Sequence, residues 1–131
     1  MIEVAIQTAV FAKLNADLNK PVYSMGAVPD NAIGQYVVIG ADTHNEWDTD
    51  DEIGYESTVT IHAWDNESNT RGFGALKTLM GQINESLHRA SLNVSGYNFI
   101  GCQFEFSDAF IDADGLTRHG VMRFRIFTSE V

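Results

Sequence analysis

Apolar side chains recur at helical spacing in two segments of this chain. In residues 2–19 they stand three or four positions apart, which places them on one side of a helix. Pro21 has no backbone N–H to donate, so we expect the first helix to end before it. The second segment gives the strongest helical signal, with repeats of three and four residues between its apolar positions: Phe73, Leu76, Met80, Ile83 and Leu87.

Four other segments alternate between apolar and polar residues, as half-buried strands do. They cover residues 35–43, 55–65, 98–110 and 117–128. The clearest is the second, where one face would carry Tyr55, Ser57, Val59, Ile61 and Ala63. Val22-Tyr23 can add a short extended piece, and residues 24–34 form a loop by their glycine, proline and asparagine content.

The last two strands predict an irregular hairpin. The pattern places Ile100, Cys102, Phe104 and Phe106 inward on one strand, opposite Met122, Phe124 and Ile126. Asp112 to Gly115 reads as a turn. A plain four-residue loop that paired Ile111 with Leu116 would set Phe104 opposite Arg123 and mix core with surface. We therefore predict a five-residue loop or a β-bulge.

These elements predict a single α+β domain over residues 1–131, in the order α-β-β-α-β-β. The expected architecture is a two-layer sandwich, with both helices on one face of a four-stranded antiparallel sheet. Trp64 and Phe127 on the other face suggest a partner. That face would show the following residues: Glu56, Thr58, Thr60, His62, Trp64, Glu105, Arg123 and Arg125.

Two details of the second helix stay open. Asn69 or Thr70 can cap its N-terminus. Gly74 and Gly81 lie on its polar side, where each costs roughly 1 kcal/mol relative to alanine. Either these are surface glycines that a well-packed helix tolerates, or the backbone of another chain lies close to that side.

Charge is unevenly distributed along the 131 residues, whose formal net charge is −10. Residues 1–70 hold twelve acids and two lysines, whereas residues 71–131 hold six acids and six bases. An electronegative first half repels phosphate, which argues against a direct grip on nucleic acid. It suits a basic protein partner, or a surface past which nucleic acid slides.

Residues that could carry chemistry do not combine into a site. Cys102 alternates with core phenylalanines, so we interpret it as a buried apolar residue rather than a nucleophile. His44, His62, His88 and His119 lack metal-ligand spacing and are interpreted as surface or hydrogen-bonded histidines. The acidic clusters do not match a calcium loop. We expect no catalytic residues, no metal, no other cofactor and no membrane span.

An acidic loop between the first two strands is the most charged feature of the chain. Its acids are Asp42, Glu46, Asp48, Asp50, Asp51 and Glu52. The loop is either a solvated, mobile hairpin loop or an electrostatic contact with a basic surface. That surface could be on a partner, or could be the Arg118, Arg123 and Arg125 patch of a second copy. Trp47 and Ile53 favour contact, because a purely solvated loop has little use for tryptophan.

The chain resembles the tail completion proteins of long-tailed phages, also called tail terminator or tail-to-head joining proteins. The most specific stretch runs from Asp114 to Arg125 (DGLTRHGVMRFR). Supporting pieces are Pro21-Val22-Tyr23, Tyr36-Val37-Val38-Ile39-Gly40, Trp47-Asp48 and Thr60-Ile61-His62-Ala63-Trp64. Gln35 departs from the pattern, since relatives often have proline before the tyrosine.

The resemblance implies a structural protein of the virion tail, made in the host cytoplasm. Such proteins form a ring, typically of six subunits, that caps the tail tube and joins it to a head-completion or connector protein. DNA passes through such a ring without specific binding. A ring needs a head-to-tail interface, and our candidates are the acidic loop with Trp47 on one side and Trp64, Arg118, His119, Arg123 and Arg125 on the other.

The sequence is also compatible with two other functions. One is a small acidic binding module that sequesters a basic partner, as acidic mimics of DNA do. The other is a small α+β enzyme, which would need a pocket with convergent polar groups. A ring or a concentration-dependent oligomer in solution would favour the tail protein over the binding module.

Overall fold

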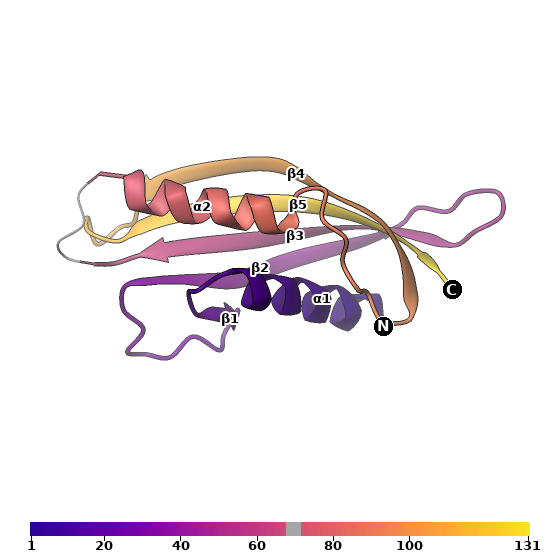
Figure 1. Cartoon of the computed structure of the whole chain (residues 1–131), viewed down its shortest axis with the longest axis horizontal. Coiled ribbons are helices and arrows are strands. Elements are labelled where there is room, and N and C mark those ends of the chain that lie inside the picture. The colour runs from indigo at the N-terminus through magenta and orange to yellow at the C-terminus, as the bar shows by residue number, and fades with distance from the viewer. Residues whose placement is uncertain (68–71) are drawn as a thin grey trace.

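The computed structural model describes residues 1–67 and 72–131 of the chain (Figure 1). Two helices and five strands follow one another along the sequence. They are α1 (Ile2–Asp17), β1 (Val22–Ser24), β2 (Gln35–Glu46), β3 (Gly54–Asp65), α2 (Gly74–Leu87), β4 (Tyr97–Ile111) and β5 (Arg118–Glu130). Within the described residues, neither helix is long and apolar enough to cross a bilayer.

The α+β sandwich with both helices on one face of the sheet is confirmed, but the sheet differs from the expected one. It has five strands in the order β1-β2-β3-β5-β4, rather than four. It is also mixed, because β1 pairs with β2 in parallel while the other pairs are antiparallel. Three residues are too few to show alternation, which is why Val22-Tyr23 could be read only as an extended piece.

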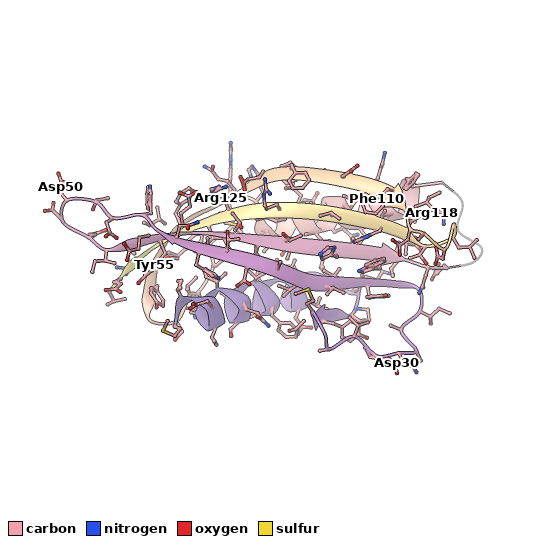
Figure 2. The ribbon with its side chains drawn as sticks, turned by 180° about the vertical axis from the view of Figure 1, so that it is seen from behind. Asp30, Asp50, Tyr55, Phe110, Arg118 and Arg125 are labelled. Carbon is pink, nitrogen blue, oxygen red and sulfur yellow. The ribbon has the colours of Figure 1, made fainter. Side chains whose placement is uncertain are left out.

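A single hydrophobic core fills the space between the helices and the sheet. Ile6 and Leu14 of α1, Leu76 and Ile83 of α2, and Phe124 of β5 are completely buried in it. Figure 2 shows the sheet from the other side, with the helices behind the strands. The helical spacing in the sequence therefore identified the buried faces correctly.

The β4–β5 hairpin is irregular, as predicted. Ile111 pairs with Arg118, and bulges at Ile100 and Glu105 shift the register so that Phe104 faces Phe124 in the core. Two inward assignments were wrong for the same reason. Phe106 pairs with Arg123 on the open face, and Ile100 is half exposed. Each bulge inserts one residue, and strict alternation cannot be extrapolated past it.

The helices are shorter than the sequence indicated. The first ends at Asp17 instead of residue 19, because Leu18 already has extended backbone angles. The second begins at Gly74, after Phe73 in the cap position. The cap candidates Asn69 and Thr70 lie outside the described residues.

Candidate functional site

The middle of the open sheet face carries an ion-pair network. Arg125 Nη2 lies 2.9 Å from Glu105 Oε2, and Arg125 also contacts the carboxylate of Glu56. Arg123 Nε lies 3.1 Å from Glu105 Oε1, and its guanidinium stacks over the Phe106 ring. These side chains come from β3, β4 and β5, which the register brings side by side. The two arginines are thus largely neutralised within their own chain.

An aromatic cluster occupies one end of the same face. The rings of Trp64 and His119 stack with centroids 3.7 Å apart, and Phe110 packs 4.9 Å from His119. His62 Nδ1 and His119 Nε2 share a hydrogen bond of 2.7 Å. Tyr36 stacks 6.4 Å from Trp64. This packing explains why a tryptophan stands at position 64 on the open face. It also buries His119, which strand alternation alone placed at the surface.

Burial changes how the two clustered histidines titrate. Desolvation lowers the pKa of His62. The pKa of His119 is lowered first by desolvation and then by the neighbouring His62 charge, while Asp112 opposes the shift. Because protonating both rings would place like charges across a 2.7 Å contact, this end of the sheet favours neutral histidines.

The loop after β1 crosses the aromatic end of the open face. Met25, Gly26 and Val28 form an apolar hollow with Tyr36 and Trp64 below them. The crossing lets β1 run parallel to β2, with Met25 N–H donating to the Ile39 carbonyl. Met25 remains well exposed, so part of this apolar surface faces solvent.

The acidic loop is a hydrogen-bonded turn at the tip of the β2–β3 hairpin. Trp47 N–H donates to the Gly54 carbonyl (2.8 Å), and Thr49 N–H donates to the Glu52 carbonyl (2.9 Å). Asp48 Oδ1 accepts the Gly54 N–H (3.1 Å), which gives this acid a role in building the turn. The remaining acids at the tip, Asp50, Asp51 and Glu52, are exposed.

One of the apolar side chains of the loop packs against its own chain. The Trp47 ring packs against Phe127 of β5 with centroids 4.8 Å apart. Trp47 is nevertheless 39% exposed and Ile53 49% exposed. Both therefore retain apolar surface that a partner could cover.

The two remaining acids lie on β2 before the tip. The Asp42 carboxylate lies 2.7 Å from His44 Nε2. The other ring nitrogen of His44 lies 2.8 Å from Ser57 Oγ. Glu46 is exposed at the last position of the strand. The sequence showed these acids as part of one loop, but the structure places them on a strand.

Within one chain the tip of the acidic loop and Arg118 are far apart. Figure 2 shows Asp50 and Arg118 at opposite ends of the molecule, with Arg125 between them. The eleven residue steps from Gly54 to Asp65 span roughly 36 Å of strand. A contact between the tip and Arg118 therefore has to involve two copies, whereas Arg125 lies across β3 from Thr43 of the same chain.

Sequence reasoning missed an apolar edge. β4 is the last strand of the sheet, and several large apolar side chains along it and its turn are 39–72% exposed: Ile100, Phe106, Phe110, Ile111 and Leu116. A long edge strand with exposed apolar side chains is a common site of association. The one signal in the sequence was the inconsistent pairing of Phe104 with Arg123 in a regular hairpin, which predicted an irregularity but did not place it at Glu105.

Other reactive side chains have structural surroundings. Burial raises the pKa of the Cys102 thiol to about 12. His88 Nδ1 accepts the Phe104 N–H at 3.0 Å, so all four histidines are hydrogen-bonded. In residues 1–67 and 72–131 no group of three or more His, Cys, Asp or Glu side chains is placed to hold a metal ion.

Comparison with known proteins gives a consistent result. The family described as "Tail completion protein gp17" matches residues 7–129. The chain is 24% identical over 90 residues to the tail completion protein gp17 of Bacillus phage SPP1, and the alignment covers 69% of this chain and 64% of that protein. It thus spans just under two thirds of this curated relative.

Two solved structures share the fold. One is a chain of the virion of a native gene transfer agent particle, with a TM-score of 0.85, 22% identity and coverage of 98% of this chain and 97% of the other. The second is the bacteriophage SPP1 gp17 protein, with a TM-score of 0.57, 23% identity and coverage of 94% and 88%.

Proposed function

Because this chain belongs to the phage tail completion protein gp17 family, we propose that it caps the tail tube as a ring and joins the tail to the head. Its partners would be further copies of itself, six in the ring by family resemblance, the tail tube protein, and a head-completion or connector protein. The observation that carries this proposal is the match of the family over residues 7–129.

The surface of the molecule supports a structural role without catalysis. Ordered ion pairs, stacked rings and exposed apolar side chains on the open face and the β4 edge are features of contact surfaces. A formal charge of −10 would let DNA pass without sticking, because phosphates are repelled. The site of action would be the virion tail, after synthesis in the host cytoplasm.

Tail morphology tests this proposal directly. In a phage or prophage that encodes this chain, removal of its gene should yield headless tails of uncontrolled length, measured by electron microscopy. Supplying the wild-type chain in trans should restore tails of uniform length attached to heads. Normal, head-attached tails in the absence of the gene would exclude the proposed role.

A second measurement separates this role from sequestration of a basic protein. Purified chain should bind to the ends of tail tubes isolated from the deletion strain. Free basic proteins should not compete at equal concentration. Competition by any basic protein, with no binding at tube ends, would favour the acidic binding module instead.

A further inference from the structure

Both outer edges of the sheet carry backbone groups that pair with no strand in the described structure. On one side β4 is the last described strand. On the other side β1 covers only Val37 to Ile39 of β2, so the outer part of β2 from Asp42 to Glu46 has no strand beside it in the described structure. Unpaired edges are templates for another strand.

The alternation of hydrogen-bonded and non-bonded pairs along the β4–β5 ladder identifies which backbone groups of β4 point outward. Asp112 N–H donates to the Thr117 carbonyl, closing the hairpin with β5. Since pairs in an antiparallel ladder alternate between bonded and non-bonded, the backbone groups of Ser107, Ala109 and Ile111 point away from β5. The Ala109 N–H is met by the adjacent Asp108 carboxylate at 2.8 Å rather than by a strand.

Only the second half of this edge is open. Earlier on β4, the Cys102 carbonyl accepts the Arg89 N–H (2.8 Å), and the Phe104 N–H donates to His88. The connection from α2 thus occupies the edge up to Phe104. From Ser107 to Ile111 no strand among the described residues pairs with this edge, and the Asp108 carboxylate on the Ala109 N–H is a local contact that an incoming strand could replace.

A groove of about 470 Å³ runs between this open edge and α2. Its walls are Lys77, Met80, Gly81 and Asn84 on the helix, and Phe104 with Ser107 to Ala109 on β4. A Cβ on Gly81 would meet nothing within 4 Å, and Asn84 Oδ1 is buried without a hydrogen-bond partner among the described residues. A groove between a helix and an edge strand is the setting in which proteins add an extended strand.

The backbone groups of β2 alternate in the same way. Trp47 N–H donates to the Gly54 carbonyl, so alternation turns the backbone groups of Asp42, His44 and Glu46 toward the free side of β2. Three antiparallel pairings separate β2 from β4, so the two strands run in opposite directions. Copies placed side by side in one orientation would therefore pair β4 with the next β2 as an antiparallel ladder.

Charge near the receiving edge is mixed. The free part of β2 carries Asp42 and Glu46 and leads into the acidic tip. The groove beside the β4 edge holds Lys77 as its base and Asp108 as its acid. A second copy is favoured as the partner because each chain carries both free edges, and these run in opposite directions, as a head-to-tail interface requires.

We propose that a second copy of this chain inserts the β2 edge from Asp42 to Glu46 beside the β4 edge from Ser107 to Ile111, continuing the sheet from subunit to subunit. This inference rests on the proposed ring and names its junction. The two edges lie toward opposite ends of the molecule, so successive copies are staggered along the strands, as in closed barrels.

Two edge-blocking variants test the junction without knowledge of its exact register. Ser107→Pro and Glu46→Pro each remove an outward N–H at an exposed edge position, where proline is tolerated because the ladder within the chain does not use that donor. The matched controls Ser107→Thr and Glu46→Gln keep the N–H. Circular dichroism and thermal melting verify that all four variants fold.

Sedimentation velocity gives the readout. The wild type and both controls should assemble with rising concentration, and each proline variant alone should stay monomeric. An equimolar mixture of the two proline variants should form a dimer and nothing larger, because one intact β2 edge then meets one intact β4 edge.

Each contrary result overturns the proposal. If the mixture stays monomeric while the wild type assembles, or if a proline variant assembles like the wild type, the junction lies elsewhere and the ring itself stands. A wild type that remains monomeric at millimolar concentration excludes a second copy as the occupant. Failure of the proposed function is read separately, from tail length and head attachment in the deletion strain.

Discussion

The two faces of the sheet are stabilised in different ways. The helix-covered face is closed by aliphatic side chains and Phe124, which exclude water completely. The open face is held by ion pairs around Glu105 and by rings stacked on Trp64, with many of these side chains partly accessible. The first arrangement maximises buried apolar area, whereas the second keeps side chains ordered at a surface that can still bind.

This difference separates stability from assembly. Changes on the covered face should unfold the chain, because the cost of a cavity in a tight core is large. Changes on the open face or at the sheet edges should leave the monomer folded and alter how copies meet.

The largest effect is expected from Phe124→Ala. Phe124 is fully buried and packs edge-to-face on Phe104, so its loss should lower the free energy of unfolding by about 3–5 kcal/mol. Phe127→Ala on the open face should cost only about 1 kcal/mol, because Phe127 is half-buried against Trp47. Urea denaturation measures both. Equal losses would mean that the two faces contribute alike.

Two glycines give a smaller contrast of opposite sign. A Cβ at Gly120 would lie 2.5 Å from Met80 Sδ, so Gly120→Ala should destabilise by about 1–3 kcal/mol through overpacking. Gly81→Ala has open space and should stabilise helix α2 by about 1 kcal/mol. Thermal melts distinguish them. A Gly81→Ala variant that melts higher but assembles less would link the groove to assembly.

Removing Arg125 tests the ion-pair network. Arg125→Met leaves Glu56 and Glu105 without their shared cation and should cost about 1–2 kcal/mol at low salt. The loss should shrink in 1 M salt, since the network is partly exposed. The triple variant with Glu56→Gln and Glu105→Gln should recover part of the stability. A salt-independent loss with no recovery would assign the role of Arg125 to packing alone.

Acidification should weaken the aromatic end of the open face. Burial lowers the pKa of His62 and His119 in the folded chain, so the unfolded chain binds more protons as pH falls below about 6.5. The free energy of unfolding should therefore decrease from pH 7.5 to 5.5 and level off below the folded pKa values. The double variant His62→Gln, His119→Gln should lose this part of the slope. An unchanged slope would show that other groups cause it.

The smallest effect on stability belongs to the acidic tip. Asp50→Lys with Asp51→Lys should change the free energy of unfolding by less than about 0.5 kcal/mol, because both side chains are exposed. Self-assembly should weaken, and added salt should weaken wild-type assembly as well. Asp30→Lys, on a different loop, is compared with Asp50→Lys alone, so that both reverse one charge. If assembly withstands both the charge reversal and salt, the tip is only a solvated turn.

Much of the fold was accessible from the sequence because alternation and helical spacing are local. The repeats around Leu76 and Ile83, and the alternation from Tyr55 to Ala63, record which side of each element meets the core. The bulge on β4 could be predicted as well, since pairing Phe104 with Arg123 was physically inconsistent.

The candidate surface was less predictable. The acids were visible, but only the structure shows Asp48 holding a turn and Asp42 beside His44. The arginines were visible too, yet their neutralisation by Glu56 and Glu105 depends on three strands meeting. The open β4 edge was missed because an edge is a property of strand order, which no local pattern encodes.

The sequence by itself determined the element types, the buried faces and the excess of acids in the first half, because each depends on residue type and short-range spacing. Tertiary structure alone decided the strand order, the parallel β1, and which edges and charges remain unpaired. These depend on contacts between residues far apart in the chain, such as Asp65 with Arg118 in the strand register and Trp47 against Phe127. Association is governed by those leftover edges and charges, so it becomes readable only once the chain has folded.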